Sequence, residues 1–334
     1  MRRLVLAASA LVLAACGDDA PLLSTAPDPA PALSRAVAGP LDAKTGYDIK
    51  TWGYFPNDSS EFTDPQWREI FRAAERWEEV LAPSDPWALE AGTLYCPGVA
   101  GTTARVNAEI DDIIILFRVV RIDGEGGTLA QAAPCVVRTK GILAPFGPAT
   151  LEFMPVYGIV QVDEADLPAL TRDRTLGDVL THEIGHALGF ASQAWEILDL
   201  VRDARPAGSA MYYDTYYVGD RAMEAFDEIA DGYDGNIVPV DNVGFSFTAH
   251  WRESVMGDEI MSPSIRGGTA LSLVTANAFA DLGYTINPRA VDRYKLPDQS
   301  AADVGADHGG HDHDDVLDVP VMMIARDGKI IPPR

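Results

Sequence analysis

Basic residues and cysteines are both scarce in this chain of 334 residues. It carries 26 lysines and arginines against 50 aspartates and glutamates, and its formal net charge is −24. A field of this sign repels nucleic acid and anionic lipid head groups, which argues against either as a partner. Hydrophobic residues make up 47% of the chain and aromatic residues 8%, as in ordinary globular proteins, so a disordered chain is excluded.

The N-terminal stretch lacks the length of a membrane span. Residues 1–15 hold two arginines and an apolar run, whereas about 20 apolar residues are needed to cross a bilayer. We therefore expect a cleaved secretion signal. The ending Leu13-Ala-Ala-Cys16 resembles the lipobox of bacterial lipoproteins, which implies cleavage before Cys16 and attachment of lipid to its sulfur. The alternative is a plain signal peptide with an incidental cysteine.

A lipid anchor implies an extracytoplasmic location, on a bacterial membrane or at the cell surface. Gly17 after the cysteine favours the outer membrane in a two-membrane bacterium. Residues 16–44 are rich in proline, alanine and serine, which predicts a flexible tether. Cleavage would also remove Arg2 and Arg3 and so change the net charge from −24 to −26. The anchor, not electrostatic attraction, would then hold the protein at a membrane.

Two cysteines remain besides Cys16, namely Cys96 and Cys135. An even pair in an oxidising compartment predicts one disulfide, and two separate buried thiols are the alternative. Alkylation and intact mass, measured with and without reductant, distinguish the two arrangements.

The hydrophobic pattern predicts an α+β order of elements. A strand at residues 47–54 precedes a helix that begins at Asp64-Pro65 and ends at Pro83. The β-branched run of residues 112–121 is typical of a strand buried on both faces, at the centre of a sheet. The other expected elements are short strands at 136–137 and 151–156, helices from 176, at 221–229 and at 271–282, and a hairpin over 319–331.

The pattern His-Glu-x-x-His occurs at His182, Glu183 and His186, in an apolar stretch with helical spacing. Residues four apart share one face of a helix, so both imidazoles can reach one ion. Glu183 would lie beside that ion without binding it, where a general base takes a proton from water. A chance pair of histidines on one helix face is the alternative. Thr175 and Asp178 predict a capping box at the start of this helix.

A catalytic zinc site normally has three protein ligands, so two histidines are not sufficient. The candidates for the third ligand are His250, the tail histidines His308, His311 and His313, and the carboxylates of Glu196, Glu224 and Glu228. The tail histidines lie in the polar, glycine-rich run of residues 303–315. That run could bind a second ion, but it is better explained as a solvated linker.

The segment from His182 to Phe190, with His250-Trp251 and Glu259-Ile260-Met261 downstream, resembles the leishmanolysin-like zinc peptidases of the metzincin clan. Most metzincins place the third histidine six residues after the second, where this chain has Ser192. Leishmanolysin-like enzymes displace it beyond an insertion, and residue 250 follows residue 186 by 64 positions.

The resemblance assigns a role to each of these elements. It implies that His250 is the third ligand and that Gly189 lets the chain leave the helix sharply. Met261 would lie in a tight turn beneath the metal, as an apolar floor and not as a ligand. No tyrosine closely follows Met261, so none is given a role. No cysteine lies between Cys16 and Cys96, which argues against a propeptide that blocks the metal with a thiolate.

The resemblance also implies an α+β, metzincin-like zincin fold. A twisted mixed sheet would carry helices above an active-site cleft, with a smaller C-terminal subdomain below. We expect a peptidase domain at 45–287, divided into 45–190 and 191–287, and a C-terminal extension at 288–334. Residues 151–156 are the expected edge strand for pairing an extended peptide.

The expected function is that of a zinc endopeptidase with one Zn²⁺ and a protein or peptide substrate. His182, His186 and His250 would hold the ion, which acidifies water and polarises the scissile carbonyl. Glu183 would take the proton and pass it to the leaving amine. The alternatives are a binding lipoprotein without turnover and a zinc hydrolase of another amide substrate.

Overall fold

The structure is a computed structural model, and it describes residues 47–53, 61–82, 89–90, 93–105, 109–110, 112–138, 153–203, 215–230, 237–241, 249–297, 315–317, 319–324 and 330–331. The expected signal peptide, Cys16, the tether and the histidines 308, 311 and 313 lie outside the described residues. None of the helices in these ranges is long and apolar enough to cross a membrane.

A six-stranded mixed sheet is the frame of the molecule, in the order β1-β7-β9-β8-β14-β15. Strands β1, β7 and β9 are parallel, and β8 runs antiparallel to β9. Strand β14 pairs with β8 in the parallel sense and with β15 as a hairpin, which confirms the hairpin expected over 319–331. The strands are β1 (Ile49–Gly53), β7 (Ile113–Val120), β8 (Ala130–Arg138), β9 (Met154–Asp163), β14 (Met322–Ile324) and β15 (Ile330–Ile331).

The position of strand β7 in the sheet explains why its sequence is continuously apolar. It lies inside the sheet between β1 and β9. Ile113, Ile115 and Phe117 belong to one hydrophobic core, and Ile114 and Leu116 belong to a second core on the opposite face. Because successive side chains point to opposite faces of a strand, a sheet covered on both sides requires an apolar residue at every position. The strand expected at 112–121 is therefore confirmed.

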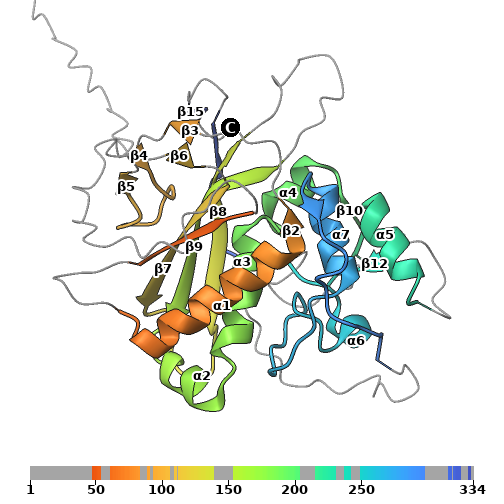
Figure 1. The fold of residues 1–334 in the computed structure, drawn as a ribbon, viewed down its shortest axis with the longest axis horizontal. Coiled ribbons are helices and arrows are strands. Elements are labelled where there is room, and N and C mark those ends of the chain that lie inside the picture. Colours follow the sequence, from red (N-terminus) through yellow and green to blue (C-terminus); the bar gives the residue numbers. More distant parts are fainter. Residues whose placement is uncertain are drawn as a thin grey trace, which may run out of the picture.

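Seven helices lie in the described part of the chain, and they fall into two groups (Figure 1). Helices α1, α2 and α3 lie on one face of the sheet, whereas α4 to α7 gather beside it. The helices are α1 (Asp64–Val80), α2 (Leu167–Asp173), α3 (Leu176–Ala187), α4 (Ser192–Ile197), α5 (Asp220–Asp227), α6 (Glu253–Met256) and α7 (Leu273–Asp281). Together with the mixed sheet they form the expected α+β, metzincin-like fold.

Helix α1 supports α3 from the outside. Its start is fixed by the Thr63 amide, which donates to the Gln66 side chain at 2.8 Å. Its apolar stripe includes Trp77, which is fully buried and donates from its indole to the carbonyl of Thr181 at 2.7 Å. This bond joins the middle of α3 to α1, so the helix that carries His182 has its position fixed by the core.

Short strand pairs connect the remaining segments. Strand β2 directly follows α1 and pairs with β13, which follows α7. This pairing joins the end of the helix group α4 to α7 to the end of α1. A three-stranded sheet, in the order β10-β11-β12, lies in the insertion between α4 and His250. The pairs are β2 (Leu81–Ala82) with β13 (Thr285–Ile286), β3 (Leu89–Glu90) with β6 (Glu109–Ile110), and β4 (Thr93–Leu94) with β5 (Ala104–Arg105); the three-stranded sheet holds β10 (Val201–Asp203), β11 (Thr215–Tyr217) and β12 (Val238–Pro239).

Cys96 and Cys135 are joined in a disulfide. Both cysteines belong to the second core, on the sheet face opposite to α3. The bond ties the loop that follows β4 to the middle of β8. It therefore crosslinks the cover of that face to the sheet itself.

Two expected strands differ from the structure. Residues 151–156 were expected as an edge strand, but β9 begins at Met154 and lies between β7 and β8 in the interior of the sheet. The edge-strand assignment is therefore wrong. The strand expected at 136–137 is nine residues long, and Pro134 within it coincides with a shift in register against β9. Because the proline and the bulge interrupt the period-two pattern, the sequence did not show the full length of β8.

Candidate metal centre

Helix α3 carries His182 and His186 on one face, four residues apart. Both side chains are buried, with 2% and 0% of their surface exposed. The capping box expected at the start of the helix is not formed, because the Thr175 side chain makes no capping bond. Asp178 instead accepts a hydrogen bond from the amide of Gly268 at 2.6 Å. The first turn of α3 is thus tied to the loop that precedes α7.

Two main-chain carbonyls fix the orientation of these imidazoles. His182 Nδ1 donates to the carbonyl of Ile260 at 2.6 Å, and His186 Nδ1 donates to the carbonyl of Phe190 at 3.1 Å. A carbonyl can only accept, so the Nδ1 atoms carry the protons and the Nε2 atoms carry lone pairs. Such partners are typical of metal-binding histidines, because they fix the tautomer and the ring orientation.

Gly189 makes the second of these contacts possible. Its φ of 107° lies in the left-handed region, which strains any residue with a side chain, and a Cβ there would lie 3.2 Å from the Phe153 ring. The turn lets the Phe190 amide donate to Gly185 at 3.0 Å. The Phe190 carbonyl thereby returns toward the helix and reaches the ring of His186.

His250 reaches the same point from a loop in the second helix group. Its carbonyl accepts from the Asp241 amide at 2.8 Å, and the amide of Trp251 donates to the Met261 carbonyl at 3.0 Å. The indole of Trp251 is fully buried and packs edge-on against Phe190, with ring centroids 5.0 Å apart. The backbone on both sides of His250 is therefore fixed by the core and by hydrogen bonds.

A buried carboxylate, Glu259, organises the loop beneath the histidines. It accepts hydrogen bonds from the amides of Met261 and Ser272, at 2.7 and 3.1 Å. It also accepts from the hydroxyls of Ser272 and Thr275, at 2.7 and 2.5 Å. Burial raises the pKa of Glu259, and these four hydrogen bonds act in the opposite direction. Thr275 also accepts from the Trp251 indole at 2.8 Å, so the network joins the His250 loop to α7.

Met261 packs directly against α3. A Cβ placed on Gly185 would lie 2.6 Å from the Met261 sulfur, so only glycine allows this approach between the two histidines of the helix. Met261 is fully buried, and its neighbour Ile260 supplies the carbonyl that His182 binds. The role expected for Met261, an apolar floor beneath a metal ion, stays a prediction, and the sequence pattern did not indicate the need for Gly185.

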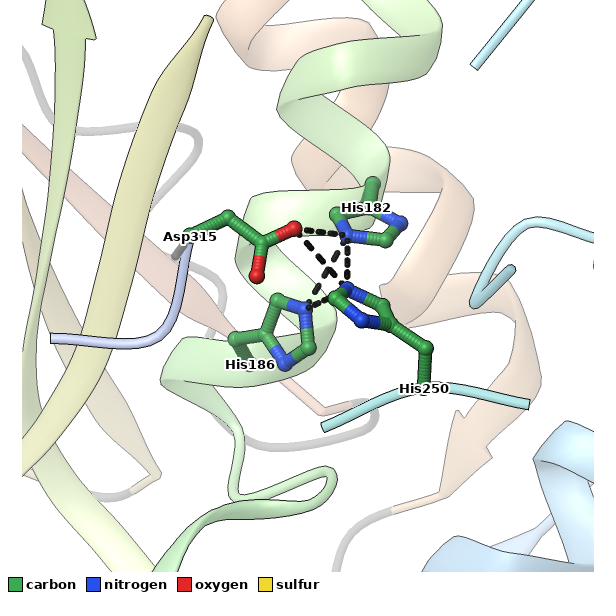
Figure 2. A group of neighbouring side chains, drawn as sticks. All are labelled: His182, His186, His250 and Asp315. Atoms are coloured by element: carbon green, nitrogen blue, oxygen red, sulfur yellow. Dashed lines mark hydrogen bonds and ion pairs between the residues drawn. The ribbon is translucent and has the colours of Figure 1, made fainter. Parts of the chain in front are cut away.

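The three histidines converge through their Nε2 atoms (Figure 2). The distance is 3.0 Å between His182 and His186, 3.1 Å between His182 and His250, and 3.2 Å between His186 and His250. Lone pairs that face one another at this separation repel unless a cation lies between them. Tetrahedral zinc ligands at about 2.1 Å from the ion are about 3.4 Å apart, which is close to the spacing seen here. The donor set therefore fits a metal ion.

Asp315 completes the group, and sequence reasoning missed it. One of its oxygens, Oδ2, lies 2.8 Å from His250 Nε2 and 3.2 Å from His182 Nε2 (Figure 2). The side chain is buried, and the four residues form the group among the described residues that could hold an ion. Burial favours a higher pKa for Asp315, but His250 and His182 outweigh it and keep the pKa well below the usual range.

Glu183 is buried beside this group. Its Oε2 atom has no hydrogen-bond partner among the described residues, so it can still accept a proton from a molecule bound at the site. Burial raises the pKa of Glu183, and the nearby charge of Asp315 raises it further. The pKa of His186 is lowered, chiefly by burial and then by His182. Burial at this position thus favours the neutral imidazole of His186, the form that binds metal.

The three carboxylate candidates for a third ligand do not join this group. Glu196, Glu224 and Glu228 are exposed on α4 and at the end of α5. The histidines 308, 311 and 313 lie outside the described residues. Asp315 ends the run that was expected to be a solvated linker, and no spacing rule distinguishes it from the other aspartates there. Its only signal is the apolar alternation that follows it, which becomes β14.

The fold and this arrangement define a class: a metallopeptidase built on a helical His-Glu-x-x-His pattern, a distant third histidine and a methionine packed beneath the helix. Comparison with known proteins gives the family. The model of the leishmanolysin peptidases matches residues 103–291, more than half of the chain. The chain therefore belongs to the leishmanolysin family. None of the curated proteins compared with it matches.

Proposed function

We propose that the protein is a zinc-dependent endopeptidase whose ion is held by His182, His186 and His250. The observation that carries this proposal is the convergence of three buried Nε2 atoms within 3.0–3.2 Å of one another. Zinc is the ion that three imidazoles suit best in a peptidase, and three protein ligands leave a position for chemistry. The family assignment supports a peptide or protein as the substrate.

The histidines would bind the ion, and Glu183 would transfer the proton. A zinc ion at this position supplies Lewis acidity, which polarises the scissile carbonyl and lowers the pKa of a water molecule to about 7. Glu183 accepts the proton of the attacking water through its Oε2 atom and then donates it to the nitrogen of the leaving amine. The carbonyls of Ile260 and Phe190 keep His182 and His186 in the metal-binding tautomer throughout.

Glu183→Gln tests this division directly. Glutamine keeps the shape of the side chain but cannot accept the proton, and loss of a general base typically costs about 10²–10⁴-fold in rate. We expect peptide cleavage to fall by that factor while zinc content stays near that of the unmutated protein. Exposed Glu164 provides a matched control, and Glu164→Gln should change neither quantity. Unchanged turnover in Glu183→Gln would rule out this mechanism.

We further propose that a lipid on Cys16 anchors the enzyme outside the cytoplasm. The support is the lipobox-like ending of the N-terminal stretch, residues 13–16, and the proline-rich segment that follows it. Cys16→Ala should move the protein to the soluble fraction or leave the signal uncleaved, without loss of metal. Unchanged membrane fractionation together with an unchanged mass would show that no lipid is attached there.

A further inference from the structure

The C-terminal segment, residues 315–317 and 319–324, lies along the outer edge of β8. The amide of Ala132 donates to the carbonyl of Asp315 at 2.8 Å, and the amide of Leu317 donates to the carbonyl of Ala132 at 3.0 Å. Further along, Met322 to Ile324 pair in the parallel sense with Val136 to Arg138 as strand β14. The segment therefore occupies the edge that β8 would otherwise present for pairing with another chain.

This pairing brings the Asp315 side chain to the metal-binding group. The two main-chain bonds at Ala132 fix the backbone of Asp315, and its Oδ2 atom lies 2.8 Å from His250 Nε2. A carboxylate oxygen at about 2.0–2.2 Å is an ordinary zinc ligand. With three imidazoles it makes a closed set of four, which is characteristic of structural zinc sites and leaves no position for water or substrate.

We propose that the C-terminal segment is an autoinhibitory latch, in which Asp315 is the fourth metal ligand and β14 covers the β8 edge that an extended peptide needs. The inference rests on the proposed function, since it concerns the regulation of the same site. Opening the latch exposes a coordination position and a strand edge together. The enzyme is then latent until the segment leaves, with a carboxylate in place of the thiolate that some related peptidases use.

The topology makes this release feasible. Within the described residues, β14 pairs only with β8 and β15, so its departure breaks no other ladder and leaves β1, β7, β9 and β8 as a sheet. The three histidines are held by α3 and by the loop above Glu259, neither of which depends on β14. The segment does bury Val319, Met322 and Ile324, so we expect the closed form to predominate.

Asp315→Ala tests the latch with readouts that do not require turnover. A probe that binds only the open form has its affinity reduced by the fraction of open molecules, so a latch closed in 90–99% of molecules weakens it about 10- to 100-fold. We expect Asp315→Ala to keep its zinc, to bind a peptide hydroxamate tighter by that factor, and to change the visible spectrum of the cobalt-substituted protein. Asp314→Ala, which removes the neighbouring charge, should leave all three properties unchanged.

A second variant keeps Asp315 and weakens only its support. Leu317→Pro removes the amide that donates to Ala132. It should raise hydroxamate affinity in the same direction as Asp315→Ala, although by less. Neither variant replaces a histidine or Glu183.

The possible outcomes distinguish failure of the latch from failure of the proposed function. Loss of zinc in Asp315→Ala would show a permanent structural ligand, and an unchanged cobalt spectrum and probe affinity would show that Asp315 does not bind the ion. Either result overturns the latch. A spectral change and tighter probe binding without any peptide cleavage would support the latch and count against the peptidase function.

Discussion

The metal-binding group has two unlike sides. On one side, His182, His186 and His250 are fixed by a helix, by main-chain carbonyls and by the buried network of Glu259. On the other side, the segment that carries Asp315 is fixed to strand β8 by two main-chain bonds, one from the Asp315 carbonyl and one from the Leu317 amide. The histidine side is therefore held by the hydrophobic core, whereas the aspartate side belongs to a segment that pairs with one strand of the sheet.

The difference indicates which part of the site can move. Displacing a histidine requires α3 or the Met261 loop to leave the core, which amounts to unfolding. Displacing Asp315 requires only that the hairpin of β14 and β15, with the residues that precede it, detach from β8. Local openings of this kind cost less than global unfolding. We therefore read the histidine side as the permanent metal site and the aspartate side as its switch.

The largest expected effect comes from His250→Ala. Without His250 the open form keeps only two imidazoles, which make a weak zinc site, and the closed form depends on Asp315, so we expect most of the zinc and more than about 99% of the activity to be lost. Metal analysis and peptide assays measure this. The triple change of His308, His311 and His313 to alanine is the control and should leave both largely intact. If the control loses zinc and His250→Ala does not, the third ligand has been misassigned.

Glu259→Gln should have the next largest effect, and on stability. The amide would turn an N–H toward the Met261 amide or toward the Ser272 donors, and a buried unsatisfied donor costs about 1–3 kcal/mol. We expect thermal unfolding to show a lower midpoint and zinc affinity to fall with it, because the loop that holds His182 loosens. Asp258→Asn, at the exposed neighbouring carboxyl, is the control. Equal stability of both variants would show that Glu259 does not stabilise the loop that holds His182.

Met261→Leu should change little. Leucine has a similar volume, so the cost is expected to stay below about 1.5 kcal/mol, with zinc content unchanged because the thioether is not a ligand. Denaturant unfolding and metal analysis check the two parts. A loss of zinc as large as that of His250→Ala would contradict the role of Met261 as a packed floor.

The smallest effect is expected at Glu78, a half-buried carboxylate far less well held than Glu259. It accepts one hydrogen bond, from the Ile49 amide at 2.8 Å, and burial raises its pKa from 4.5 to about 7. Because the folded pKa lies above the unfolded one, the stability that Glu78 contributes is complete below about pH 4.5 and declines as pH rises toward 7.

Glu78→Gln removes this dependence on pH. Relative to the unmutated protein, its melting temperature should be higher at pH 8 than at pH 5, by about 1–3 °C after allowance for solvent screening. Glu79→Gln, at the exposed neighbour, serves as the control. A difference of the opposite sign would show that the hydrogen bond to Ile49 outweighs burial.

The sequence was most informative where the chemistry is local. The spacing of His182 and His186 predicts a shared helix face, and the β-branched run of β7 predicts a strand buried on both sides, because each depends only on neighbours in the chain. The link to His250 needed the family resemblance, since 64 residues separate it from His186 and no periodicity spans that distance.

The rest could not be read from the sequence because it depends on long-range pairing. Asp315 meets His182 across 133 residues, and only the parallel pairing of β14 with β8 brings it there. The same pairing explains why the expected edge strand at 151–156 was wrong: β8 and then β14 lie outside β9. The role of Gly185 likewise follows from its contact with Met261 and not from local pattern.

The most direct test is digestion of a mixed peptide library, with products read by mass spectrometry, by the unmutated protein and by Asp315→Ala. Both proteins are assayed with and without a chelator. We expect new internal termini in both digests, about 10- to 100-fold more with the variant, and none when the chelator is present. Cleavage that survives the chelator, or zinc-loaded Asp315→Ala that cuts no peptide, would contradict the proposal that this site is a zinc endopeptidase.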